Sequence, residues 1–229
     1  MSGQYAGTVC LATRHWMPFV AAEPLEMPTA SAQALANFMP LLLCGEVSAE
    51  CVFTQAAQRL PVDIAPRLKQ ALLQIADDEK RHGELLLAVR SMLPSPAERQ
   101  MARRAAHFLR RLATDDLGLQ MARLAALDAG FCLVLAALCR PGTQIAALPA
   151  LRSVFDAIRC DEGRHVRVSR DCADALGISA VQEATARRQV LNQFAALLAG
   201  LSTELSILGL DSARLLNRLR RIGDSAPAP

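Results

Sequence analysis

The stretch Asp78-Glu79-Lys80-Arg81-His82 recurs 83 residues later as Asp161-Glu162-Gly163-Arg164-His165. Both copies read D-E-x-R-H, and each lies in the middle of an apolar stretch with helical periodicity. A glutamate and a histidine three positions apart share one face of a helix. Both Glu-x-x-His pairs are predicted to point into a helical core, because apolar side chains occupy the same face: Leu72, Ile75, Ala76 and Leu86 in the first copy, and Leu151, Phe155, Ile158 and Val166 in the second.

Acidic and imidazole side chains in an apolar core need partners. An unpaired buried polar group costs at least ~2 kcal/mol, and divalent cations would remove that cost. Glu46 precedes Glu79 by 33 residues and Asp128 precedes Glu162 by 34, each within a long apolar stretch. Two helical hairpins would set each acid level with the Glu-x-x-His of the next helix. The sequence therefore predicts a site for two metal ions with six ligands: Glu46, Glu79, His82, Asp128, Glu162 and His165.

The composition favours helices packed closely on one another. Of 229 residues, 52% are hydrophobic and only 4% are aromatic, and the apolar residues are mainly Ala and Leu, which favour helix. No segment alternates with period two, so the predicted fold class is all-α. The net charge is only +3. A balance this mild gives little support for a nucleic-acid surface, and we expect no DNA partner.

Proline, glycine and capping residues divide the chain. Residues 1–30 are expected to form an irregular arm, residues 31–176 a four-helix bundle, and residues 177–229 additional C-terminal helices and a tail. Pro40 predicts a kink or a break in the first helix. Asp63 is the expected N-cap of the second helix, and residues 179–209 are expected to form one continuous helix.

The cysteines and the N-terminus bear on location. Seven cysteines occur without any C-x-x-C pair, which is typical of buried thiols in a reducing compartment. The N-terminal residues show no basic region followed by an apolar run, so no signal peptide is expected. The most apolar segment, residues 131–138, is too short to span a bilayer. We therefore expect a cytoplasmic protein with no membrane partner.

The repeat and its two upstream acids resemble the ferritin-like di-iron carboxylate superfamily over residues 31–176. The longer D-E-x-R-H form is similar to the oxygen-activating branch, which includes bacterial multicomponent monooxygenases and ribonucleotide reductase small subunits. The resemblance implies that Asp78 and Asp161 hold the ligand histidines through hydrogen bonds. It also implies that Arg81 and Arg164 pair with those two acids.

Two departures from the superfamily pattern limit the resemblance, and a third residue bears on one of its subgroups. Asp128 stands where the superfamily usually has Glu. Tyr5 is the only tyrosine, so a tyrosyl radical within the bundle is not expected. Ile158 lies one turn before Glu162, where the arylamine N-oxygenases of the superfamily carry an additional histidine, which argues against a close match to them.

The function implied by the resemblance is that of an O2-dependent di-iron oxidoreductase. Such an enzyme would hydroxylate or otherwise oxygenate a small-molecule or carrier-bound organic substrate, using two iron ions, O2 and an electron-donor reductase. The ligand set does not distinguish two iron ions from a mixed manganese–iron pair. Two alternatives stay open: a ferroxidase or other iron-handling ferritin-like protein, and a tRNA-modifying hydroxylase, for which the arginine excess gives weak support.

Two further residues lie one turn after the lone acids. Glu50 follows Glu46, and Cys132 follows Asp128. A solvated acid and a packed core thiol are the ordinary interpretations of these residues. We expect both to line a pocket for O2 and substrate, on the side of the bundle that carries the lone carboxylates.

The C-terminal helices carry a basic surface, for which a solvated face is the default interpretation. The alternative is an acidic carrier protein or a phosphate-bearing substrate. The basic residues are Arg187, Arg188, Arg214, Arg218, Arg220 and Arg221.

Overall fold

The computed structural model describes residues 25–61, 64, 66–97 and 100–225. Within these residues the chain is all-α, with eight helices and no strand, so the predicted fold class is confirmed. The helices are α2 (Thr29–Arg59), α3 (Pro66–Ser91), α4 (Gln100–Arg110), α5 (Leu117–Leu138), α6 (Pro149–Ala175), α7 (Ala180–Ala199), α8 (Ser202–Ile207) and α9 (Ser212–Asp224).

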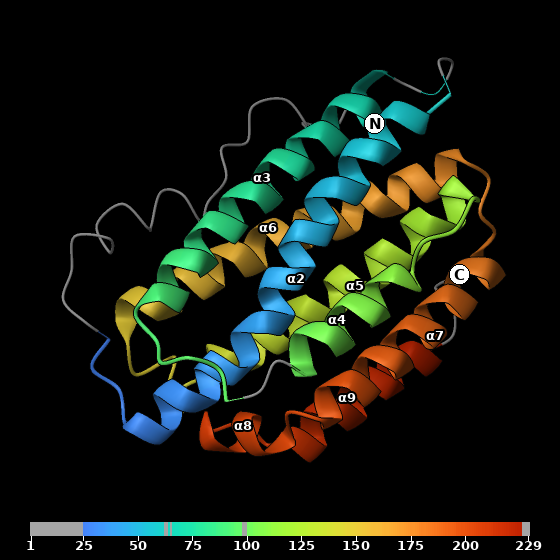
Figure 1. The fold of residues 1–229 in the computed structure, drawn as a ribbon. Helices are drawn as coiled ribbons and strands as arrows, with labels where there is room; N and C mark the ends of the chain where they lie inside the picture. Colours follow the sequence, from blue (N-terminus) through green and yellow to red (C-terminus); the bar gives the residue numbers. More distant parts are fainter. Residues whose placement is uncertain (1–24, 62–63, 65, 98–99, 226–229) are drawn as a thin grey trace.

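Two helical hairpins form the centre of the bundle (Figure 1). Helix α2 packs along α3, α5 packs along α6, and the hairpins meet where α3 contacts α6. On the other side, the described parts of α2 and α5 approach each other at a few points at most, and α4 packs against both α2 and α7. The two helices with Glu-x-x-His are therefore neighbours, and the two helices with a lone acid stand apart.

The apolar core consists of two clusters with a polar layer between them. On α3 one cluster ends at Ala76 and the other resumes at Leu85. On α6 the clusters are bounded by Ile158 and Val168 in the same way. Each gap holds one copy of the D-E-x-R-H repeat, so apolar packing above and below shields this layer from water.

Helix α2 runs through Pro40 without a break. A proline inside a helix costs roughly 3 kcal/mol because it removes one hydrogen bond and its ring crowds the preceding turn. The side chains on either side of it are fully buried, including Phe38, Met39 and Leu41. Their burial keeps the helix continuous. The other predicted feature, Asp63 as an N-cap, lies outside the described residues.

The prediction of one helix over residues 179–209 is wrong. Helix α7 ends at Ala199, Gly200 is its C-cap, and α8 begins at Ser202. Leu201 leaves the helical conformation with a φ of −118°, and its side chain is buried in the core. The chain turns at this point because the turn places Leu201 against the bundle.

The C-terminal helices share their core with the bundle. Helix α7 packs on α5 and α9 packs on α7, while α8 contacts α2. Phe194 of α7 and Leu219 of α9 belong to the same apolar cluster as Phe155 of α6. The described part of the chain after residue 176 therefore packs against one side of the bundle, on α5 and α2. Most of the expected N-terminal arm, residues 1–24, lies outside the described residues.

Two described helices, α2 and α5, are long and apolar enough to cross a membrane by length and composition alone. The most apolar window of α5 is 67% buried and that of α2 is 33% buried. Core helices of soluble proteins pass the same test, so this finding neither supports nor opposes the expectation of a cytoplasmic protein.

Candidate metal centre

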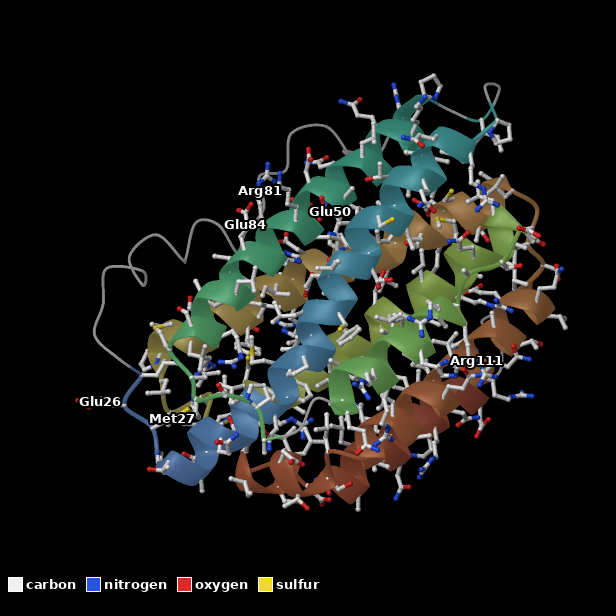
Figure 2. All side chains as sticks on the ribbon, viewed as in Figure 1. Glu26, Met27, Glu50, Arg81, Glu84 and Arg111 are labelled. Atoms are coloured by element: carbon white, nitrogen blue, oxygen red, sulfur yellow. The ribbon has the colours of Figure 1, made fainter. Side chains whose placement is uncertain are left out.

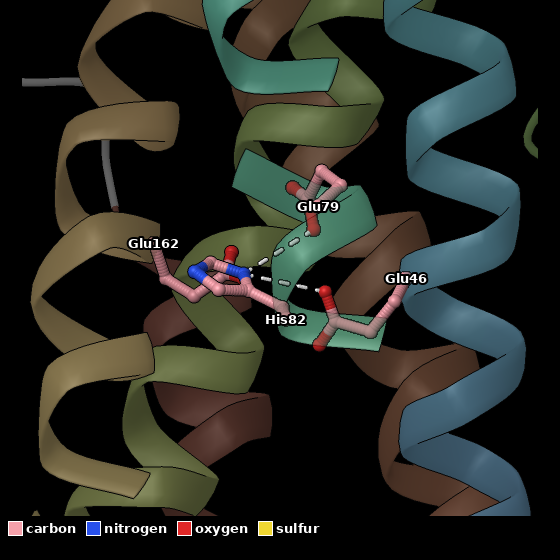
Figure 3. A group of neighbouring side chains, drawn as sticks. All are labelled: Glu46, Glu79, His82 and Glu162. Atoms are coloured by element: carbon pink, nitrogen blue, oxygen red, sulfur yellow. Dashed lines mark ion pairs between the residues drawn. The ribbon is translucent and has the colours of Figure 1, made fainter. Parts of the chain in front are cut away.

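Four side chains from three helices form a buried group that could hold a metal ion (Figure 3). They are Glu46 of α2, Glu79 and His82 of α3, and Glu162 of α6, and their ligand atoms all lie within 4.8 Å of one another. His82 Nδ1 lies 3.4 Å from Glu46 Oε2, 3.7 Å from Glu79 Oε2 and 3.8 Å from Glu162 Oε1. One imidazole nitrogen thus faces three carboxylates.

His165 adjoins this group from α6. Its Nδ1 lies 2.9 Å from Glu79 Oε1 and 3.6 Å from Glu162 Oε2. The centroids of the His82 and His165 rings are 5.8 Å apart. Glu79 and Glu162 therefore each lie beside both imidazoles, and two neighbouring sets of ligand atoms share these two carboxylates.

Asp128 joins the site from α5. Its carboxylate is buried and lines the same cavity as Glu46, Glu79 and Glu162. Asp128 Oδ2 accepts no hydrogen bond from any described residue. The structure therefore brings all six side chains predicted as ligands to one buried region, with Asp128 on the cavity side.

Behind the imidazoles, each histidine faces an aspartate of the other hairpin. His82 Nε2 lies 3.3 Å from Asp161 Oδ2, and His165 Nε2 lies 3.7 Å from Asp78 Oδ2. Each ring thus has an aspartate at Nε2 and carboxylates at Nδ1. The sequence indicated that an aspartate adjoins each histidine, and the structure adds that the pairing crosses between α3 and α6.

Two arginines adjoin these aspartates. Arg164 Nη2 donates a hydrogen bond to Asp78 Oδ2 and lies 3.9 Å from Asp161 Oδ1. Arg81 Nη1 donates to Asp78 Oδ1 over 3.2 Å. The Arg81 side chain is 44% exposed and lies on the outer side of α3 (Figure 2), whereas that of Arg164 is 13% exposed. Arg164 is therefore the more buried of the two arginines, and it lies against aspartates of both hairpins.

The buried charges shift one another's pKa values. Burial, reinforced by Glu79, raises the pKa of Glu46 well above its usual value. The pKa of Asp128 is also raised well above its usual value, mainly by burial and secondly by the charge of Glu162. The pKa of Glu162 is raised mainly by burial and secondly by the charge of Glu79. Burial disfavours charge on both Glu79 and His165, but their mutual attraction outweighs it, so the pKa of Glu79 is lowered and that of His165 is raised. Three of the four carboxyl groups therefore favour the protonated form more than they would in water.

A cavity of about 40 Å³ lies beside the carboxylates, between α2, α5 and the end of α4. Its walls are mostly apolar and include Val52, Leu109, Leu112, Leu127 and Phe131. The volume is sufficient for a water-sized molecule. Neither histidine lines this cavity, so it opens on the side of the lone carboxylates.

The residues that line the cavity differ from those the sequence suggested. Neither Glu50 nor Cys132 is among them, and the lining residues that α2 and α5 contribute include Ala49, Val52 and Phe131 instead. Cys132 Sγ donates to the Arg159 carbonyl oxygen over 3.6 Å. Burial, followed by the Glu162 charge, raises its pKa to about 12. This thiol faces the backbone of α6.

One wall of the cavity contains a residue that no sequence pattern had identified. Gln120 is buried and lines the cavity, and its Oε1 accepts a hydrogen bond of 2.9 Å from Arg59 Nη1. Arg59 also donates to the Asp115 carbonyl oxygen, and Arg123 donates to that of Leu112. These bonds fix the segment between α4 and α5 over the cavity. These hydrogen bonds depend on tertiary packing, which the periodicity and spacing of residues in the sequence do not predict.

The chain matches no protein-family model, no curated protein and no solved structure. The fold and the site define its class on their own: an all-α helical bundle with a buried group of carboxylate and histidine side chains that could bind metal.

Proposed function

We propose that this protein is an O2-dependent di-iron oxidoreductase that oxygenates an organic substrate in the cytoplasm, with α2, α3, α5 and α6 forming a ferritin-like four-helix bundle. One observation carries the proposal. His82 and His165 share the carboxylates of Glu79 and Glu162 on one side, and each faces an aspartate on the other. Fixing the second nitrogen of an imidazole is how proteins orient a metal-ligating histidine.

The donor atoms fit two divalent iron ions. Carboxylate oxygens and imidazole nitrogens suit iron, and a mixed manganese–iron pair would use the same donors. Four ionised carboxylates balance the charge of two divalent cations. Glu46 Oε2 and Asp128 Oδ2 are buried and accept no hydrogen bond from the described residues. The nearest imidazole nitrogen to Glu46 Oε2, His82 Nδ1, is 3.4 Å away, so a cation between them would bind both atoms.

Each residue then has a task in the proposed reaction. When bound, a pair of ferrous ions supplies two electrons and open coordination positions for O2. Asp78 and Asp161 keep the Nδ1 atoms of the histidines directed at the carboxylates. Leu127 and Phe131 exclude water from the space beside Asp128, where O2 would enter. In a monooxygenation O2 would take two electrons from the iron pair and two from the substrate, and the two lost by the iron pair would have to be restored before the next turnover. The proposal therefore includes a reductase as partner.

The substrate would be larger than the cavity beside the site. A volume of about 40 Å³ accommodates a diatomic gas but not an organic molecule. Leu109 and Leu112 line the cavity at the end of α4. A small or carrier-bound substrate would therefore reach the site by displacing this segment.

Metal analysis tests the proposed site. Anaerobic loading with ferrous iron should give about two equivalents per chain, and Glu79→Ala or Glu162→Ala should lower this number sharply. Glu84→Ala is the matched control, because Glu84 is an exposed acid on the same helix as Glu79. A folded protein that binds almost no iron contradicts the proposal.

Oxygen consumption separates catalysis from iron handling. The reduced protein should consume one O2 for each iron pair and then require a reductant and an organic substrate for turnover. Oxidation of many iron ions per chain, with retention of a mineral core, would favour a ferroxidase. Salt-dependent binding of tRNA would favour a tRNA hydroxylase.

A further inference from the structure

A second concave site lies between the end of α5 and α9. It has a volume of about 360 Å³ and is lined by four arginines: Arg140 just beyond α5, and Arg214, Arg218 and Arg221 on α9. The three arginines of α9 are spaced four and three residues apart, so they project from one face of that helix. We call this site the α5–α9 groove.

The α5–α9 groove is separate from the candidate metal centre. The groove-lining residues of α5 are Leu133 and Ala137, which lie five and nine residues after Asp128. At the rise of an α-helix these separations correspond to about 8 and 14 Å along the axis. None of the six proposed metal ligands lines the groove. Nothing bound in the groove by the arginines would touch the carboxylates of the metal centre.

The four guanidinium groups have no acidic partner among the described residues. The arginine ion pairs that the structure contains involve other arginines, such as Arg188 of α7, which pairs with Asp224 over 3.3 Å. Asp211 is the one acid among the described lining residues. Its Oδ1 accepts the backbone N–H of Arg214 as the N-cap of α9. The groove thus gathers four like charges, none of which forms an ion pair with an acid of the described residues.

The walls of the groove are held in place by the backbone. The Gln144 N–H donates to the Leu208 carbonyl oxygen over 3.0 Å, which ties the turn after α5 to the turn before α9. Gly209 has a φ of +89°, and a Cβ atom there would lie 3.1 Å from the Gly142 oxygen and from Thr143 Cα. The close approach of the two turns therefore requires glycine at position 209, and it fixes the backbone at one end of the groove.

The chemistry of the lining suits an organic phosphate. Guanidinium groups bind phosphate oxygens in pairs of parallel hydrogen bonds. Four arginines and Asp211 give the lining a charge of +3, and a diphosphate group carries roughly three negative charges. Leu133 and Leu215 add an apolar wall, which a purely inorganic anion would leave exposed to water.

We propose that the α5–α9 groove binds a small organic ligand through a diphosphate group. The four guanidinium groups hold the phosphate oxygens, and the apolar body of the ligand lies against Leu133 and Leu215. An extended nucleic-acid surface is less well supported, because Asp211 and Asp224 interrupt the basic face of α9 and Arg188 is already paired. The inference is independent of whether the other site binds iron.

Calorimetric titration of the full chain with inorganic pyrophosphate tests this inference. Arg218→Gln removes the central guanidinium and should weaken binding roughly tenfold or more, as expected for hydrogen bonds between charged groups. Arg220→Gln is the matched control on the same helix with the same change of charge. Arg220 donates to Asn217 Oδ1 and does not line the groove, so its loss should leave the affinity within about twofold.

Each other outcome overturns the inference. Absence of saturation by pyrophosphate up to about 1 mM means that the groove is not a diphosphate site. Equal weakening by Arg218→Gln and Arg220→Gln means that only net charge matters. Inorganic phosphate binding as tightly as pyrophosphate removes the case for a diphosphate. Duplex RNA that binds without competition from pyrophosphate assigns the arginines to a nucleic acid.

Discussion

Asp161 illustrates what a single side chain contributes behind the proposed ligands. It lies 3.3 Å from His82 Nε2 and is contributed by the other hairpin. We predict that Asp161→Ala weakens iron binding by roughly 10–100-fold, the usual effect of losing a group that orients a ligand. Competition with a chelator measures this affinity. Asp156→Ala on the same helix is the control, because the Asp156 side chain is 47% exposed. Complete loss of iron would instead identify Asp161 as a ligand.

The shifted pKa values of the proposed ligands predict how metal binding depends on pH. The pKa values of Glu46, Asp128 and Glu162 are raised, chiefly by burial, and that of His165 is raised by Glu79. Groups with raised pKa values hold protons that a cation must displace. We therefore predict that binding releases protons and that apparent affinity increases with pH above the usual carboxylate range. Calorimetry in two buffers of different ionisation enthalpy measures the release. Affinity that falls with rising pH would contradict the assignment.

At the scale of helices, the spacing of residues predicted most of the site. Both Glu-x-x-His pairs and the lone acids Glu46 and Asp128 sit on helix faces that local periodicity defines, so their convergence followed from the helical pattern. The position of the cavity could not be predicted from the helical pattern, because it depends on the distance between α2 and α5 and on where α4 packs. Leu112 and Gln120 line it through tertiary contacts, and nothing in their local sequence marks them.

The cavity between α2 and α5 predicts where a larger side chain blocks the reaction. Ala49 lines it on α2, and Ala49→Phe should fill the space while the six proposed ligands keep their positions. We predict unchanged iron content and a reaction with O2 slowed at least about tenfold, equivalent to roughly 1.4 kcal/mol of activation free energy. Stopped-flow absorbance of the reduced protein measures this rate.

Val47→Phe provides the comparison for that experiment. Val47 lies on the same helix and is 66% exposed, so the same aromatic side chain would extend into solvent there. Thermal unfolding of both variants checks the packing, since overpacking typically costs 1–3 kcal/mol. If Ala49→Phe reacts with O2 at the parent rate, O2 reaches the site by another route.

At the scale of the whole molecule, the polar layer between the two apolar clusters joins the hairpins. Arg164 and Asp78, 86 residues apart, and His82 and Asp161, 79 residues apart, meet at this level. Most other packing of the central helices is within a hairpin, α2 with α3 and α5 with α6. The candidate metal centre is therefore the place where two locally formed units depend on each other.

This dependence has a consequence for the order of folding. Contacts within a hairpin close shorter loops and form early, whereas the pairing of His82 with Asp161 joins residues 79 positions apart. We predict that Asp161→Ala speeds the unfolding of the metal-free protein and leaves its refolding rate nearly unchanged, as for contacts absent from the transition state. Stopped-flow measurements over a range of urea concentrations separate the two rates, and slower refolding would place the contact in the folding nucleus. Metal bound between the two hairpins, where contacts form late in folding, would therefore slow the unfolding of the protein.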